Sequence, residues 1–143
     1  MLSHTCKIAI KAVIYLSSRS EHGEKASVKE IASKIGASEH TIGKTLQVLV
    51  KHNIINSLKG PSGGFFLDEI QQNQSIYNIV VTIEGQSIFK ECGLGLSVCS
   101  ETHPCPIHDE YKVVRELTEK IFKENTIKDL KDSVSSGLAF LMG

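Results

Sequence analysis

The sequence of 143 residues contains no continuous apolar run of the roughly 18 residues that a transmembrane helix needs. Its N-terminal stretch also lacks the basic-then-apolar order and the small-residue cleavage site of a signal peptide, because Lys7 and Lys11 interrupt it. Internal repeats and low-complexity tracts are absent as well. We therefore expect a cytoplasmic protein of one compact domain or two small ones, with 41% hydrophobic residues to form a core.

The sequence carries no net charge, but its charges are unevenly distributed. Residues 1–60 contain nine Lys or Arg and four Asp or Glu, a net charge of +5, and residues 61–143 carry the compensating −5. A basic first half suggests that this half alone meets a polyanion. A chance spread of solvated surface charge is the alternative explanation.

The first half has the pattern of two short helices followed by a hairpin, after an apolar-striped helix expected over residues 4–20. A capping box at Ser27 predicts a helix that Gly36 ends, and Ser38 is an N-cap for the next one. On that third helix we expect Ile42, Leu46 and Leu49 to face inward and Thr41, Lys44, Thr45 and His52 to face outward. Strand-like runs at residues 54–58 and 64–67 flank turn residues 59–63, so the order predicts a winged helix-turn-helix.

The second half is predicted to be helical around one loop. Ser75 starts a short helix that Gly85 ends, residues 86–105 form a loop, and Pro106 opens a long helix to about residue 125. Thr126 caps a last helix. The predicted fold is mostly α with a small β-hairpin wing. Its parts are a DNA-binding domain (1–85), a cysteine-bearing loop (86–105), and a dimerisation helix with a C-terminal helix (106–143).

The winged pattern predicts a DNA-binding surface, with protein contact as the less favoured alternative. Short polar groups early in the recognition helix can reach base edges, and a cation on the wing can meet the backbone or the minor groove. Serines at helix starts can place amides against phosphates. The candidate DNA-binding residues are Ser27, Ser38, His40, Thr41, Lys44, Lys59, Pro61 and Ser62.

The long helix carries an apolar stripe larger than a small winged domain can cover. Such a stripe usually marks an interface, so we expect a homodimer that binds double-stranded DNA. The candidate interface residues are Ile107, Tyr111, Val114, Leu117 and Ile121.

Three of the four cysteines fall in the predicted loop: Cys92, Cys99 and Cys105, followed by His108. In a cytoplasmic chain, clustered cysteines indicate metal ligands or redox groups more often than disulfides. The wide spacing differs from the paired knuckles of a zinc ribbon and suits a larger centre. Cys6 lies outside this group and is expected to be a packing residue of the first helix and not a ligand.

With these residues in view, the sequence resembles the Rrf-two family of bacterial transcription regulators, those similar to IscR and NsrR. The resemblance rests on residues 8–12, 27–35 and 38–49, on the wing 59–65, and on the cysteines with the helix after them. It implies a homodimer on palindromic DNA that carries an iron–sulfur cluster sensing iron–sulfur status, oxidants or nitric oxide.

The resemblance also implies a ligand set. A histidine just after the third cysteine serves as fourth ligand in some members, which favours a [2Fe–2S] cluster on Cys92, Cys99, Cys105 and His108, with His103 as the rival. Other members use an acidic residue where Lys7 stands. The sequence departs from the IscR-like pattern at two points. Six residues instead of five separate Cys92 from Cys99, and Gly43 stands where such proteins often carry an acidic side chain that reads a base.

Two other functions remain open. The same DNA-binding regulator could sense through zinc or through bare cysteine thiols. An enzyme with a cysteine nucleophile is supported only by the nearness of cysteine and histidine in sequence. We therefore do not expect an enzyme.

Overall fold

The computed structural model describes residues 1–142; Gly143, the end of the predicted C-terminal region, lies outside the described residues. The order of elements is α1 (His4–Ser20), α2 (Val28–Ile35), α3 (Glu39–Lys51), β1 (Asn56–Leu58), β2 (Gly64–Phe66), α4 (Glu69–Gln72), α5 (Ile76–Glu84), the 3₁₀ helix η1 (Gln86–Phe89), α6 (His108–Glu124) and α7 (Ile127–Ser135). This confirms the mostly helical fold with a two-stranded hairpin. The short helices α4 and η1 were not predicted, and α6 begins at His108 instead of Pro106.

The winged half is built on the buried face of α1. Core residues of α1, α2 and α3 are almost fully buried, among them Leu16, Ile31 and Leu46. Cys6 is also fully buried in this core, as expected for a packing residue. Apolar residues at helical spacing on three helices thus supply one shared core.

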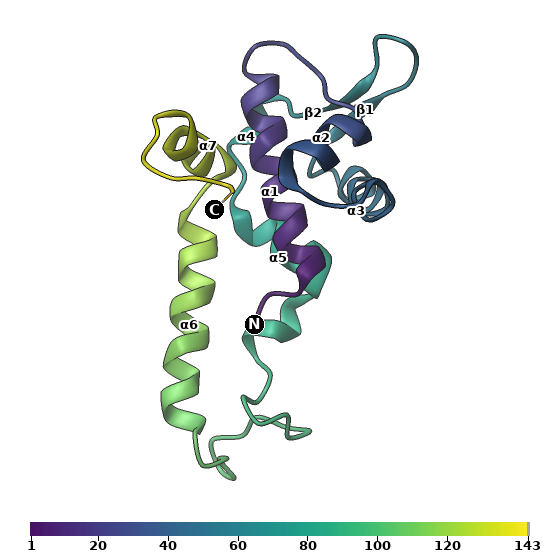
Figure 1. Cartoon of the computed structure of the whole chain (residues 1–143). Helices are drawn as coiled ribbons and strands as arrows, with labels where there is room; N and C mark the ends of the chain where they lie inside the picture. Colours follow the sequence, from purple (N-terminus) through teal and green to yellow (C-terminus); the bar gives the residue numbers. More distant parts are fainter. Residues whose placement is uncertain (143) are drawn as a thin grey trace.

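The hairpin is fixed to the helices by main-chain hydrogen bonds. β1 and β2 pair antiparallel, with Ser57 opposite Phe65. Phe65 also exchanges two backbone hydrogen bonds with Ala26, at 2.8 and 3.1 Å, just before α2. The wing is therefore joined to the start of the helix-turn-helix as well as to the end of α3 (Figure 1).

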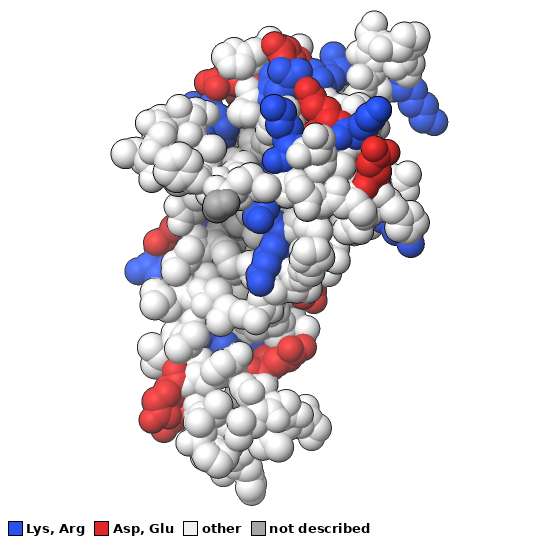
Figure 2. Space-filling model, in the orientation of Figure 1, with Lys and Arg blue, Asp and Glu red and all other residues white. Residues whose placement is uncertain are grey.

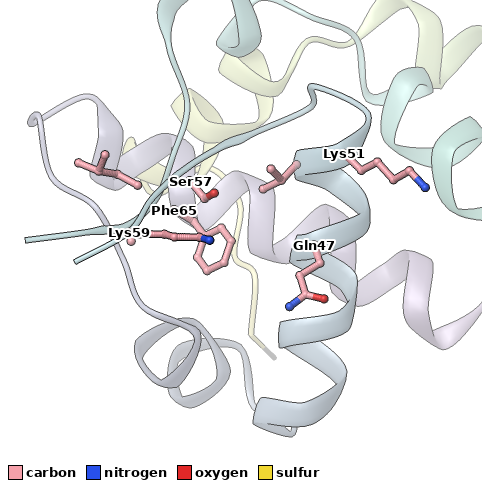
Figure 3. A pocket seen from close by; sticks show the side chains of 8 residues that line it. Gln47, Lys51, Ser57, Lys59 and Phe65 are labelled. Atoms are coloured by element: carbon pink, nitrogen blue, oxygen red, sulfur yellow. The ribbon is translucent and has the colours of Figure 1, made fainter. Parts of the chain in front are cut away.

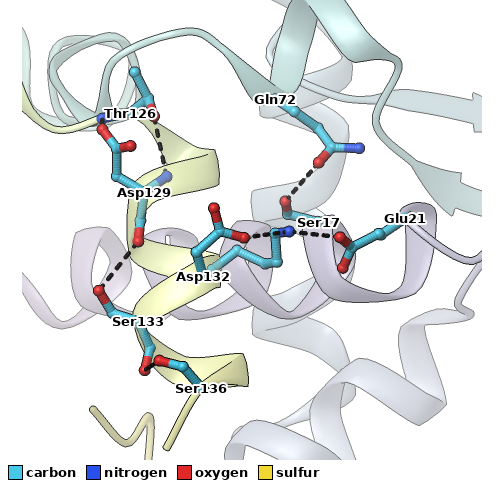
Figure 4. A network of polar contacts seen from close by, with 9 residues as sticks. Ser17, Glu21, Gln72, Thr126, Asp129, Asp132, Ser133 and Ser136 are labelled. Carbon is cyan, nitrogen blue, oxygen red and sulfur yellow. Dashed lines mark hydrogen bonds and ion pairs between the residues drawn. The ribbon is translucent and has the colours of Figure 1, made fainter. Parts of the chain in front are cut away.

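The C-terminal helices pack back on the first half. α6 runs along one side of the molecule and α7 lies beside α1 (Figure 1). In this contact the buried Lys131 pairs with Glu21 at 3.0 Å and with Asp132 at 2.6 Å (Figure 4). The Thr126 hydroxyl and the Asp129 carboxylate form a reciprocal capping box that starts α7. No helix within residues 1–142 is both long and apolar enough to cross a bilayer.

Candidate functional site

The recognition helix α3 is positioned by a tight turn. Gly36 adopts the left-handed conformation (φ 68°) that ends α2, and the Ser38 hydroxyl then caps α3 by accepting a hydrogen bond from the Thr41 amide at 3.1 Å. Ser27 caps α2 in the same way. Both serines therefore lie at helix starts, as predicted, with their hydroxyl groups engaged in capping.

The polar residues of α3 do not all face outward. His40 and Lys44 are exposed and Thr41 is half-buried. Thr45, expected on the outer face, is buried, and its hydroxyl donates to the Thr41 carbonyl at 2.7 Å. The expectation for Thr45 was wrong because a threonine can satisfy its hydroxyl within its own helix and so tolerates burial.

The wing places three predicted residues in solvent. Lys59, Pro61 and Ser62 are all exposed at the hairpin turn. Between the hairpin and α3 lies an open, mostly apolar crevice of about 390 Å³, where Gln47 of α3 faces Phe65 of β2 and Lys51 lies at the edge with its ammonium pointing away (Figure 3).

Three polar residues of this surface were not predicted. Gln47 and Lys51 lie late in α3, and the Lys25 ammonium stands 5.3 Å from the centre of the Phe66 ring at the base of the wing. Only the packing of the hairpin against α3 brings Gln47 and Lys51 to the crevice, and Lys25 reaches the wing separately, through Phe66. Lysine and arginine side chains gather over α1–α3 and the wing, whereas the opposite end of the molecule is mostly uncharged on this face, with a few acidic groups (Figure 2).

The cysteine loop, residues 90–107, lies at the end of the molecule opposite the wing (Figure 1). Its start is held by aromatic packing, because Phe89 stacks on Tyr77 of α5 at 5.5 Å between ring centres and meets Phe122 of α6 edge-on at 6.1 Å. Its end leads directly into α6. The loop is thus anchored at both ends to the helices that precede and follow it.

The four predicted ligands lie in this region as two contacting pairs. The thiols of Cys92 and Cys105 lie close enough to each other that each shifts the pKa of the other. The Cys99 Sγ lies 3.4 Å from the His108 Nδ1. No group of three or more His, Cys, Asp or Glu residues within residues 1–142 is arranged around a point that would hold one metal ion. The arrangement is therefore two pairs of donors instead of one tetrahedral set.

The two thiols of the first pair differ in acidity. Backbone N–H groups of Leu96 and Leu94 hydrogen-bond to the Cys92 sulfur and lower its pKa, since they stabilise the thiolate. The Ile107 amide has the same effect on Cys105, but burial and the neighbouring Cys92 outweigh it and raise the pKa of Cys105. Cys92 is consequently the more acidic thiol of this pair.

His108 and His103 have very different surroundings. His108 is only 6% exposed, and its Nε2 atom is buried with no hydrogen-bond partner among the described residues. His103 is exposed, and its Nδ1 lies 3.2 Å from the Thr102 hydroxyl. His108 therefore offers a buried, unsatisfied ring nitrogen to a ligand in this region.

Arg115 is a further residue of this region that was not predicted. Its Nη1 donates to the Glu91 carbonyl at 2.7 Å and its Nη2 to the Cys99 Sγ at 3.4 Å, and the side chain is 7% exposed. The sequence held one signal for it: positions 108 and 115 lie two turns apart on one helix face. With Cys99 and His108 it borders a cavity of about 310 Å³.

The outer side of α6 carries the predicted apolar stripe. Val114, Leu117 and Ile121 are each about half exposed, at 45%, 56% and 51%, and Val113, which was not predicted, is 63% exposed. Tyr111 instead lies against Gly93 of the cysteine loop and under the Arg115 guanidinium. A small apolar crevice beside Ile121 extends the stripe.

Comparison with known proteins agrees with this architecture. The model of the Rrf2 family, described as an iron-dependent transcriptional regulator, matches residues 2–133. A protein of Aquifex aeolicus described as an HTH-type transcriptional regulator is 30% identical over 132 residues, covering 91% of this chain and 90% of its own length.

Two solved structures share the fold. CymR, the global cysteine regulator of B. subtilis, superposes with a TM-score of 0.74 at 19% identity, over 92% of this chain and 96% of its own. IscR of T. potens gives a TM-score of 0.73 at 20% identity, over 98% of this chain and 93% of its own. Together with the family match, the winged helix-turn-helix identifies a DNA-binding regulator and not an enzyme. The chain belongs to the Rrf2 family of transcriptional regulators.

Proposed function

We propose that this chain is a homodimeric regulator whose DNA recognition is controlled by a [2Fe–2S] cluster held by Cys92, Cys99, Cys105 and His108. The observation that carries the proposal is the arrangement of these donors in two contacting pairs, with a buried, unsatisfied nitrogen on His108. The cluster is proposed to report iron–sulfur status, oxidants or nitric oxide, as the family resemblance implies.

The donor set fits such a cluster better than a single ion. Each iron of a [2Fe–2S] cluster takes two protein ligands, and thiolate with imidazole is a known combination. Cys92, Cys105, Cys99 and His108 would together supply the four protein donors that such a cluster needs. The family model is described as iron-dependent, which supports iron as the metal. When bound, a [2Fe–2S] cluster supplies one-electron redox chemistry and sensitivity to oxidants.

The chain's own residues provide a route from the loop to the DNA-binding half. His108 is the first residue of α6, so holding it fixes the start of the long helix to the loop. The far end of α6 leads to α7, which packs on α1 of the winged half. Ordering or freeing the loop therefore biases how α6 sits against the winged domain, which is the two-state element that control requires.

The exposed stripe on α6 supports the dimer. Three half-exposed apolar side chains at helical spacing, Val114, Leu117 and Ile121, form a continuous surface that water solvates poorly. A two-fold pair through this helix would place the two recognition helices about one DNA turn, or a small multiple, apart on a palindromic operator. Ser27, Ser38, His40, Thr41, Lys44, Lys59, Pro61 and Ser62 are proposed as the DNA contacts.

The first test measures iron, labile sulfide and the visible spectrum of anaerobically purified protein. We expect the wild type and His103→Ala to hold equal amounts of iron and sulfide, and we expect His108→Ala and Cys99→Ala to lose the cluster readily. The two histidine variants are a matched pair, since both remove an imidazole near Cys105. Absence of labile sulfide from the wild-type protein would refute the cluster proposal. Loss of iron and sulfide in His103→Ala would make His103 the fourth ligand instead of His108.

The second test asks whether the cluster controls DNA binding. Holo protein, apo protein and a variant with Cys92, Cys99 and Cys105 all changed to Ala are compared on the protein's own promoter and on genomic fragments. We expect at least one fragment to separate holo from the other two. Equal binding of all three forms to every fragment would refute control by the cluster.

A sensor of bare thiols is the alternative with an observation in its favour. Cys92 and Cys105 contact each other, and Cys92 is the more acidic thiol. Oxidation by a peroxide would join the two sulfurs, with loss of two electrons and two protons and reduction of the peroxide to water or alcohol. This alternative would be favoured if iron-free protein still changes its DNA binding on treatment with peroxide and mass spectrometry then finds a Cys92–Cys105 disulfide. Zinc is less well supported, since no single-ion site is formed within residues 1–142.

A further inference from the structure

Arg115 carries a buried positive charge that has no carboxylate partner. Its side chain is 7% exposed, and none of the ion pairs within residues 1–142 includes it. Buried charges in proteins are paired, because an unpaired one loses its hydration without compensation. The guanidinium therefore requires a negative group that is not an aspartate or a glutamate.

The contacts of Arg115 identify that group. Its Nη1 donates to the Glu91 carbonyl at 2.7 Å, the residue just before Cys92, and its Nη2 donates to the Cys99 sulfur at 3.4 Å. Of these two acceptors only the Cys99 sulfur can carry a charge. The Nε–H of Arg115 is buried and has no partner among the described residues, so a donor remains free in the same region.

The geometry points to Arg115 as the counter-charge and positioning residue of the cysteine loop, holding Cys92 and Cys99 against α6 and favouring a negatively charged sulfur centre. The planar guanidinium grips two points of the loop at once, which a lysine ammonium cannot reproduce as a fixed fork. Tyr111, one turn earlier, supports it, with the guanidinium 5.7 Å from the centre of the ring.

The charge part of this inference rests on the proposed cluster. Three thiolates and one imidazole give a [2Fe–2S] centre a net negative charge, and reduction adds one more negative charge. A buried cation beside Cys99 stabilises the reduced form more than the oxidised one. Arg115 therefore raises the reduction potential and slows loss of the cluster. The positioning part needs no cluster, because the two hydrogen bonds are made by the chain alone.

The test uses Arg115→Gln, Arg115→Lys and Lys112→Gln in the full-length protein. Lys112 is a matched control, since it lies on the same helix and pairs with Glu101 at the rim without reaching Cys99 or Glu91. Hydrogen exchange of apo protein reports positioning, and the reduction potential and rate of cluster loss report the charge. Circular dichroism verifies that each variant is folded. If Arg115→Gln does not fold, Arg115→Lys takes its place in the comparison.

In apo protein we expect Arg115→Gln to raise the exchange rate of amides in residues 91–99 about tenfold, the effect of losing charge-assisted hydrogen bonds. Arg115→Lys should fall between it and the wild type, and Lys112→Gln should match the wild type. Equal exchange in Arg115→Gln and the wild type, or an equal increase in Lys112→Gln, overturns the positioning role.

In loaded protein we expect a lower reduction potential and faster cluster loss for Arg115→Gln, with Arg115→Lys keeping most of the potential. An unchanged potential in Arg115→Gln overturns the counter-charge role. If the wild type takes up no cluster, the proposed function fails, whereas the exchange experiment still decides whether Arg115 holds the loop.

Discussion

Replacing glycine by alanine at two positions seven residues apart, Gly36 and Gly43, is expected to change stability in opposite directions. Gly43 lies inside α3, and a Cβ added there would meet only the Val28 Cγ1 at 4.0 Å, an ordinary contact. Glycine in a helix interior costs about 1 kcal/mol relative to alanine. Gly43→Ala should therefore raise the free energy of unfolding by about 1 kcal/mol and the Tm by roughly 3 °C.

Gly36 has the opposite environment. It ends α2 with φ at 68°, where a Cβ collides with its own backbone, and that Cβ would also lie 3.2 Å from the Met142 Cε. The left-handed conformation costs a non-glycine residue about 1–2 kcal/mol. Gly36→Ala should lower the Tm by roughly 3 to 6 °C.

Both variants and the wild type are compared by thermal unfolding followed by circular dichroism, at one protein concentration because a dimer's Tm depends on it. Urea titration of the same samples checks that the slope of the transition is unchanged. If Gly43→Ala lowers the Tm or Gly36→Ala raises it, the assignment of one glycine to a helix interior and the other to a left-handed cap is wrong.

Four further predictions concern the wing, the dimer, a core thiol and a helix cap. Lys59→Ala should weaken DNA binding at every site and reduce its salt dependence, because the cation is placed at the wing tip to meet phosphate or the minor groove; an unchanged salt slope would mean that the wing does not touch DNA. Leu117→Glu should shift the protein to a monomer in light scattering. Leu138→Glu makes the same change at a leucine that is 84% exposed and should leave the protein dimeric. If both variants are dimeric, the α6 interface is contradicted. Burial, together with the Glu84 carboxylate, raises the pKa of Cys6 to about 12, whereas the pKa of Cys92 is lowered. Iodoacetamide at neutral pH should therefore label Cys92 of apo protein and leave Cys6 unmodified until the protein unfolds. Hydrogen bonds from the Thr126 backbone and hydroxyl lower the pKa of Asp129 below its usual 3.8. The stability that the ionised Asp129 adds is therefore complete above pH 3.8 and is lost as the pH falls through the lower pKa of the folded state. A pKa above 3.8 in an NMR titration of this carboxylate would refute the cap.

The sequence by itself determined the secondary structure of this protein with few errors. Capping serines, the stop at Gly36 and the helical spacing of apolar residues act within a few positions of the chain, so α1, α2 and α3 are found where the pattern predicts them. The turn-rich stretch between two apolar runs likewise specified the wing, and the cysteine spacing singled out the loop. The short helices α4 and η1 were missed because four residues carry too little periodicity to be recognised.

Only the tertiary structure decided which side chains meet. The pairing of Cys92 with Cys105 and of Cys99 with His108, and the contact of Arg115 with both Glu91 and Cys99, join residues from different parts of the chain. The same holds for the crevice between α3 and the wing, where Gln47 and Phe65 face each other. Local patterns fix the direction of the backbone over a few residues, but the closing of the loop on α6 depends on packing of Phe89 between α5 and α6, which no single segment encodes.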